Sequence, residues 1–151
     1  MNWIANNVAE LLTAISILFA VLTWYIAHRN QARKDKIHYT LEVLGQTKTL
    51  EHLARADFLI NQAISKNITI DPSQVSPELE PAIFLMLNYY EDLCAWHAEG
   101  VIDGPMLKHL RGGLIKKTFD LCKPYIDDYR AKQGRDEIYL KLEQFTKTLS
   151  P

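Results

Sequence analysis

The sequence of 151 residues is poor in cysteine, glycine and proline, and it has no Lys or Arg before Arg29. Its two cysteines cannot form a disulfide framework, and none of its six glycines belongs to a phosphate-binding loop motif. The 17 basic and 18 acidic residues nearly cancel, which argues against a protein that coats nucleic acid. Because 48% of its residues are hydrophobic, the chain has enough apolar side chains for one folded domain.

An apolar stretch near the N-terminus is the most informative feature of the chain. Residues 11–27 (LLTAISILFAVLTWYIA) contain no charge, glycine or proline. With the turn in front of it, a helix over this stretch reaches the roughly 30 Å thickness of a bilayer core. Trp24 and Tyr25 end the stretch, where aromatic rings prefer the headgroup level. The alternative is the buried core helix of a soluble protein.

Basic residues follow the apolar stretch, whereas a cleaved signal peptide carries its positive charge in front. The positive-inside rule then predicts a single-pass protein of the inner (cytoplasmic) membrane with its N-terminus outside and the remaining chain in the cytoplasm. The lipid bilayer is thus its first expected partner. The predicted cytoplasmic anchor charges are Arg29, Arg33, Lys34 and Lys36.

Small and hydroxyl residues recur within the apolar stretch at alternating spacings of four and three residues. Helices in lipid associate through such small residues, and a 3.5-residue repeat predicts a left-handed supercoil. We expect the helix to leave the bilayer unbroken and to self-associate along this seam, which the register continues through Ile37, Leu41 and Leu44. Alternatively, those three residues pack on the protein's own domain. The seam within the apolar stretch consists of Thr13, Ser16, Ala20, Thr23 and Ala27.

Beyond the membrane segment the apolar spacing indicates helices, with no alternation long enough for a sheet. We predict an all-α fold, in which one N-terminal transmembrane helix continues into a cytoplasmic bundle of four or five helices. The predicted parts are the transmembrane helix with a short outside tail (1–28), the first cytoplasmic helix (29–66), a proline-rich loop (67–81) and a helical domain (82–151).

Within the helical domain, the apolar helix that ends at Gly100 is expected to be central. Gly100 suits a left-handed cap and Asp103 suits the N-cap of the next helix. Gly112 and Gly113 inside that helix suggest close packing or a kink. The expected helices after Gly100 are 105–122, a short one that Pro124 opens, and 136–149.

Charge is segregated along this part of the chain. Residues 66–103 carry a net charge of −6 and residues 108–147 a net charge of +4, so the two blocks are expected to attract each other. Solvated faces are the alternative, because surface ion pairs are weak. We also expect Glu91 to form an interhelical ion pair with Arg111 or Arg130, a structural role.

No pattern for catalysis or a cofactor emerges. The sequence has no nucleophile motif, and Cys94 and His97 are one helical turn apart without the second ligand pair that zinc requires. The aromatic segment that contains Tyr89, Tyr90, Glu91, Trp96 and His97 could line a pocket, but such a segment is more typical of a core. We therefore expect no catalytic, cofactor-binding or metal site, and no enzyme.

Loose motifs resemble a family catalogued as domain of unknown function 4760. Its "TLE.L" stretch matches Thr40, Leu41, Glu42 and Leu44 here. Its "LN..E" and "G.I" patterns match Leu87, Asn88, Glu91, Gly100 and Ile102, with Tyr125, Ile126 and Arg130 downstream. The resemblance implies one N-terminal membrane helix, a bacterial or prophage origin and no assigned activity.

These features together favour a membrane-anchored cytoplasmic module for interaction or assembly. Its partner would be a second copy or another membrane-proximal protein, and no nucleic acid is expected. The alternative is a prophage-type superinfection-exclusion or anti-phage defence effector that perturbs the membrane.

Overall fold

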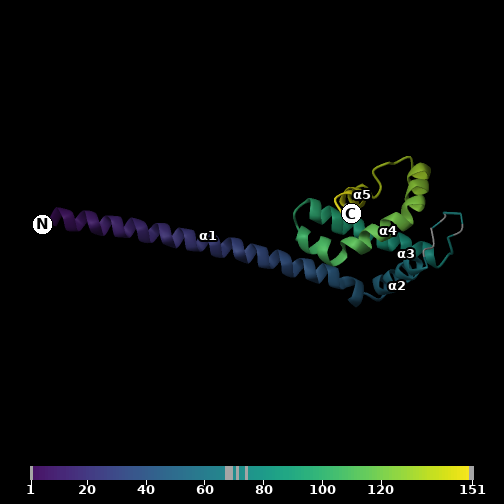
Figure 1. Cartoon of the computed structure of the whole chain (residues 1–151), viewed down its shortest axis with the longest axis horizontal. Helices are drawn as coiled ribbons and strands as arrows, with labels where there is room; N and C mark the ends of the chain where they lie inside the picture. Colours follow the sequence, from purple (N-terminus) through teal and green to yellow (C-terminus); the bar gives the residue numbers. More distant parts are fainter. Residues whose placement is uncertain (1, 67–69, 71, 74, 150–151) are drawn as a thin grey trace. The chain divides into compact units, whose positions relative to one another are not determined.

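The computed structural model describes residues 2–66, 70, 72–73 and 75–149, without the side chains of residues 2–7 and 9. Within this part the chain is all-α, as predicted, and contains no strand (Figure 1). Its helices are α1 (Asn2–Thr49), α2 (Glu51–Ser65), α3 (Leu79–Ala98), α4 (Gly104–Gln133) and α5 (Leu140–Lys147).

The chain forms two compact units, Met1–Lys36 and Ile37–Pro151. In the first unit, α1 is long and apolar enough to cross a membrane by length and composition. None of its apolar window is buried, and side chains such as Leu18 and Phe19 are about 70% exposed (70% and 69%). The alternative of a buried core helix is therefore wrong. An apolar face of this size needs another apolar environment, such as lipid.

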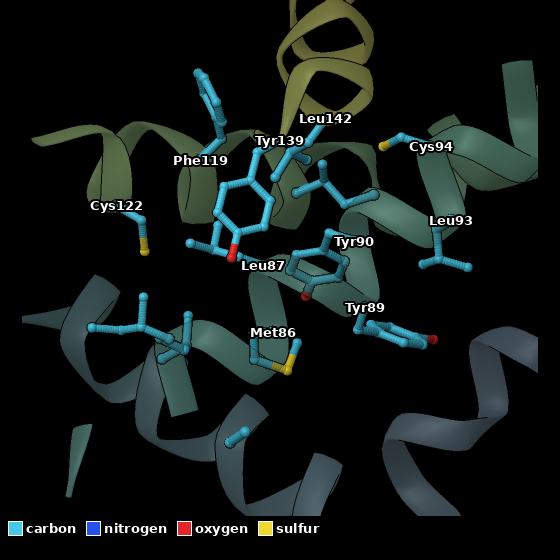
Figure 2. Close-up of a cluster of buried hydrophobic side chains, with 14 of the residues drawn as sticks. Met86, Leu87, Tyr89, Tyr90, Leu93, Cys94, Phe119, Cys122, Tyr139 and Leu142 are labelled. Atoms are coloured by element: carbon cyan, nitrogen blue, oxygen red, sulfur yellow. The ribbon is translucent and has the colours of Figure 1, made fainter. Parts of the chain in front are cut away.

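In the second unit, α3 is the central helix, as expected from its apolar content. It contacts α2, α4 and α5, and Ile83, Met86, Leu87 and Leu93 are fully buried. Figure 2 shows Met86, Leu87 and Leu93 of α3 in one cluster with Phe119 and Cys122 of α4 and Leu142 of α5. Burial of these apolar groups between α3 and the helices around it is the main stabilisation of the bundle.

The predicted helix over 29–66 is wrong, because the chain bends at Leu50. Leu50 has an extended conformation (φ −93°, ψ 114°) between α1 and α2. The Leu50 amide donates to the Gln46 carbonyl (2.9 Å), and the Leu50 carbonyl accepts from the Ala54 amide (2.9 Å). Both backbone groups of Leu50 therefore have hydrogen-bond partners. The bend lets Leu44 and Leu53 enter the same core, which a straight helix would prevent.

The predicted loop over 67–81 ends earlier, because α3 begins at Leu79. Ser76 prepares this start, since its hydroxyl accepts a hydrogen bond from the Leu79 amide (3.2 Å). Positions 67–69, 71 and 74 of the predicted loop lie outside the described residues. At the other end of α3, Gly100 has φ +74°, which confirms the left-handed cap.

Helix α4 begins as predicted, with the Asp103 carboxylate accepting from the Met106 amide (2.9 Å). It does not stop before Pro124, however, but continues through it to Gln133. Because proline removes one helical hydrogen bond and displaces a carbonyl, the helix changes direction near this point (Figure 1). Gly112 packs closely, since an added Cβ would lie 3.2 Å from Leu149, whereas Gly113 has open space.

The last helix is shorter than the predicted 136–149. It starts at Leu140, after Tyr139 takes a left-handed conformation (φ 57°) that ends the preceding turn. Its apolar row is as predicted: Leu142 and Phe145 are buried, and Ile138 and Leu149 pack against the core.

Candidate functional site

The end of α1 within the second unit is held by a buried joint. Thr40, Val43, Leu44 and Thr47 form one face of the helix and are between 0% and 6% exposed; we term them the α1 joint. The prediction that Leu44 faces a second chain is therefore wrong for this residue, which packs on its own domain. Leu41 is 49% exposed and lies off the joint.

Two helices, α3 and α4, contribute hydrogen bonds to the α1 joint. The Asp103 amide, at the start of α4, donates to the Thr40 hydroxyl (2.8 Å). The Tyr89 hydroxyl of α3 donates to the Val43 carbonyl (2.9 Å). Because these donors come from helices distant in sequence, they define the position of the end of α1, residues 37–49, against the other helices of the second unit.

Arg111 of α4 supplies the charged contact of the joint. Its guanidinium donates to the Thr47 hydroxyl (2.7 Å) and to the Leu44 carbonyl (3.4 Å). A cation near the C-terminal end of a helix also offsets the partial negative charge of the helix dipole there. Arg111 therefore contacts the end of α1, and not Glu91, which was its predicted partner.

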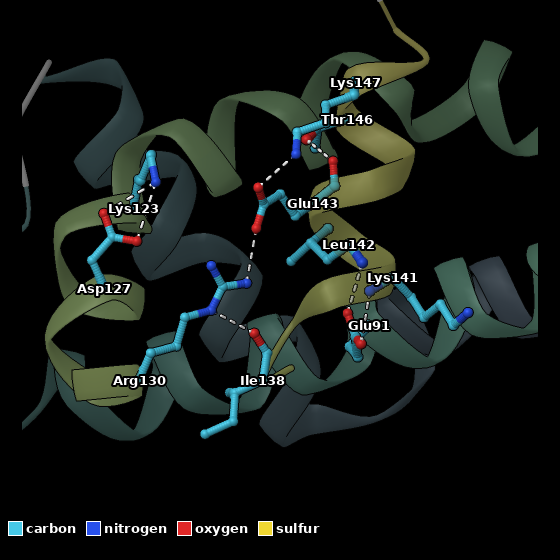
Figure 3. Close-up of polar contacts among 10 residues, drawn as sticks. All are labelled: Glu91, Lys123, Asp127, Arg130, Ile138, Lys141, Leu142, Glu143, Thr146 and Lys147. Carbon is cyan, nitrogen blue, oxygen red and sulfur yellow. Dashed lines mark hydrogen bonds and ion pairs between the residues drawn. The ribbon is translucent and has the colours of Figure 1, made fainter. Parts of the chain in front are cut away.

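Glu91 likewise has a structural role with a different partner from the predicted one. Its carboxylate accepts hydrogen bonds from the amides of Lys141 (3.1 Å) and Leu142 (2.7 Å), at the start of α5 (Figure 3). The predicted ion pair with Arg111 or Arg130 is wrong, because unpaired amides at a helix N-terminus attract the carboxylate. Glu91 thereby attaches α5 to α3.

Arg130 holds the segment that precedes α5. Its Nε donates to the Ile138 carbonyl (2.8 Å), and its terminal nitrogen forms an ion pair with Glu143 (2.9 Å), as Figure 3 shows. Both side chains of this pair are mostly shielded from water, at 14% and 21% exposure. Lys147 and Arg130 keep the pKa of the Glu143 carboxyl below its usual value by hydrogen bonding to it.

Three lysines of α4 pair within their own helix and do not join the two charge blocks. Lys116, Lys123 and Lys132 each form an ion pair with an aspartate four residues away on the same helix, at 2.7–3.4 Å. These pairs are solvent-exposed and contribute little to stability. The interpretation as solvated faces therefore fits these three lysines better than attraction between blocks.

The buried tyrosines are not tuned for proton transfer. Burial raises the pKa of Tyr89 to about 12, and the nearby Arg111 charge opposes this only in part. Burial and the Asp57 charge raise the pKa of Tyr90 further still. Both side chains are buried, at 8% and 1% exposure, so Tyr89 and Tyr90 are core residues, the interpretation that the sequence favoured over a pocket lining.

The two thiols are also unactivated. Burial raises the pKa of Cys94 to about 12, with a smaller contribution from the Glu91 charge, and burial alone raises that of Cys122 to about 12. A nucleophilic cysteine needs the opposite shift. Both cysteines act as small core side chains.

A small cleft of about 150 Å³ lies beside Cys94 and His97. The His97 ring packs edge-on against Phe145, with ring centres 5.3 Å apart. Trp96 instead contacts Tyr39 of α1. Among the described residues, no three His, Cys, Asp or Glu side chains are grouped to hold a metal ion.

The small-residue seam lies on the exposed part of α1. Thr13, Ser16, Ala20, Thr23 and Ala27 are all exposed. The Ser16 hydroxyl donates to the Leu12 carbonyl (2.8 Å) and the Thr23 hydroxyl to the Phe19 carbonyl (2.7 Å). These two hydroxyls are thus satisfied within a single helix.

The basic residues after the seam also lie on α1. Arg29, Arg33 and Lys34 are exposed, and Lys36 is half-buried. Nearby, the Gln31 amide donates to the Asp35 carboxylate (2.7 Å), so this polar segment stays helical. The structure therefore places these cations on the helix directly after the apolar stretch.

Two surface features had not been predicted. One is a cleft of about 380 Å³ along the exposed side of the α1 end, lined by Leu41, Gly45, Lys48, Leu110 and Arg111. The other is a groove between α2 and the start of α3, described further below. Leu110 is 48% exposed at this cleft, whereas Leu107 and Ile115 of α4 face the core.

Comparison with known proteins identifies one family. The model of a domain of unknown function (DUF4760) matches residues 10–149, nearly the whole chain. No curated protein and no solved structure matches significantly. Several residues of the motifs noted above hold joints of the bundle: Thr40 at α1, Glu91 at α5 and Arg130 before α5.

Proposed function

Since this chain belongs to the DUF4760 family, whose function is unknown, we propose its role from its own residues. It is a single-pass protein of the inner (cytoplasmic) membrane, with its N-terminus outside and its bundle in the cytoplasm. The bundle is a module for interaction or assembly without catalysis, and the protein self-associates.

The exposed apolar part of α1 is the observation that carries this proposal. It is uncharged over residues 11–27 and none of its apolar window is buried, so it requires lipid or another apolar surface. Arg29, Arg33, Lys34 and Lys36 follow it, which favours the cytoplasm for the remaining chain.

The proposed self-association rests on close packing along the seam. Because the hydroxyls of Ser16 and Thr23 already bond to their own helix, they supply little hydrogen bonding to a second helix. Their small size, with that of Ala20 and Ala27, still lets two backbones approach closely. The proposal therefore predicts sensitivity to side-chain volume along the seam.

The test is the mass of the full chain in detergent. The double variant Ser16→Leu/Ala20→Leu should shift the protein toward the monomer. A matched control, Ile17→Leu/Val21→Leu, changes neighbouring residues off the seam and should leave the mass unchanged. A seam variant with the same mass as the wild-type oligomer would refute self-association through this face.

The assignment of a module, as opposed to a membrane-perturbing effector, has its own test. Overexpression of an assembly module should leave the membrane potential and growth unchanged. Depolarisation with growth arrest would contradict the proposal and favour the exclusion or defence effector.

A further inference from the structure

A groove runs along the whole of α2, between this helix and the start of α3. Two adjoining hollows of about 350 and 190 Å³ form it, and both include Leu59 and Glu78. Its lining includes apolar side chains (Leu59, Ala82 and Leu85) beside charged ones (Arg55 and Glu78). The lining residues of α2 are His52, Arg55, Ala56, Leu59, Gln62, Ala63 and Lys66.

An exposed aromatic residue lies on the same helix beside the groove. Phe58 is 65% exposed, more than Tyr39 (40%) or Phe84 (41%) in the same unit. It follows Arg55 by one helical turn and precedes Gln62 by another. Large exposed aromatic groups next to an apolar groove are typical anchors of protein interfaces.

We propose that the groove receives α2 of a second copy of this chain, packed antiparallel across a two-fold axis. Each Phe58 then enters the groove of the other copy. A two-fold interface brings together the same surface of both chains. A helix that has both an anchoring side chain and a groove beside it can therefore bind a second copy of itself.

The charges of α2 favour a second copy over an unrelated helix. Glu51 begins the helix and Lys66 follows its end, and both are exposed. In an antiparallel pair centred between Phe58 and Leu59, each Glu51 lies opposite the partner's Lys66. Neither side chain has an ion pair within the described part of the chain. Antiparallel packing also aligns the helix dipoles favourably.

This inference rests on the proposed self-association, but it places the contact on α2 and not on the small-residue seam of α1. Experiments can therefore refute the α2 contact and the seam contact independently. The first experiment measures dimer dissociation of the full chain in detergent by dilution. Phe58→Ala should raise the dissociation constant at least about tenfold, as loss of a central aromatic anchor does. Leu110→Ala, an exposed apolar residue of α4, is the matched control and should have no effect.

A charge swap tests the antiparallel register. Glu51→Lys and Lys66→Glu should each weaken the dimer several-fold by placing like charges together, and the double variant should restore it. An unchanged dissociation constant in Phe58→Ala, or a double variant weaker than both single variants, would overturn the inference. A dimer lost only with Ser16→Leu/Ala20→Leu would overturn it while the proposed function stands.

If the protein is monomeric at every concentration, both the α2 dimer and the proposed self-association are wrong.

Discussion

At the scale of single residues, hydrogen bonds from side chains to distant backbone groups fix how the helices of the bundle are positioned against one another. Thr40, Tyr89 and Glu91 each bond to a main-chain group at least 46 positions away. None of these pairs is visible as a sequence pattern, because helix periodicity reports which face is buried but not which polar groups meet. The sequence suggested structural roles for Glu91, Arg111 and Arg130, but the predicted pairing of Glu91 with one of the two arginines is wrong.

Replacement of Thr40 by valine tests the α1 joint. The two side chains have the same shape, but valine leaves the half-buried Asp103 amide without its acceptor. We expect the free energy of unfolding to fall by about 1–3 kcal/mol, the cost of an unsatisfied buried donor. Thr40→Ser keeps the hydroxyl and should lose less. Equal losses in chemical denaturation would contradict the contact.

The buried thiols and Tyr89 predict a loss of stability at alkaline pH. Their pKa values rise on folding, from 9 to about 12 for Cys94 and Cys122 and from 10 to about 12 for Tyr89. The unfolded chain therefore releases protons first, and stability that is complete below pH 9 declines as the pH rises toward 12. Each group contributes a slope of about 1.4 kcal/mol per pH unit in its interval.

Denaturation at a series of pH values measures this decline. The double variant Cys94→Ala/Cys122→Ala, although less stable at neutral pH, should show a shallower dependence between pH 9 and 12. The wild-type thiols should also react with a thiol reagent only upon unfolding. Rapid labelling of the folded protein at pH 8 would show that the thiols are more acidic than the structure indicates.

At the scale of helices, composition and periodicity were sufficient for the kinds of elements but not for their ends. The cap by Asp103 and the left-handed Gly100 follow from local chemistry, and both were predictable. The bend at Leu50 was not, because no glycine or proline stands there and the requirement for it is tertiary. Pro124 led to the opposite error: a helix end was predicted before it, but α4 continues through it, because a long packed helix tolerates one lost hydrogen bond.

The groove along α2 escaped prediction for a related reason. A helical wheel shows that Phe58 lies off the buried face, yet a single exposed aromatic is common on protein surfaces. Only the packing of α2 against α3 creates the hollow beside it. Neither Phe58 nor the groove could therefore be singled out from the sequence.

The attachment of α5 to α3 depends on the Glu91 side chain. Glu91→Ala removes the acceptor of two amides at the α5 N-terminus, so we expect a loss of about 1–2 kcal/mol in the free energy of unfolding. The adjacent Asp92→Ala is the control, because Asp92 is exposed and outside this contact. Hydrogen exchange should also accelerate in α5. Equal behaviour of the two variants would exclude the cap.

At the scale of the whole molecule, a long exposed apolar helix and a folded bundle share one chain. The bundle buries its apolar side chains without the first unit, whereas the apolar stretch of that unit buries none. Segregation of the charges strengthens this division, since no Lys or Arg precedes Arg29. We therefore expect the apolar stretch of α1 to lie in lipid and the helical bundle to lie in water.

The most direct measurement is the accessibility of a tag placed after Pro151, in cells that express the intact chain. We predict that the protein sediments with membranes, and that a protease or antibody reaches the tag only after the inner membrane is permeabilised. A tag that is reached with the inner membrane intact, or a chain that stays soluble without detergent, would contradict a membrane-spanning α1 with a cytoplasmic bundle.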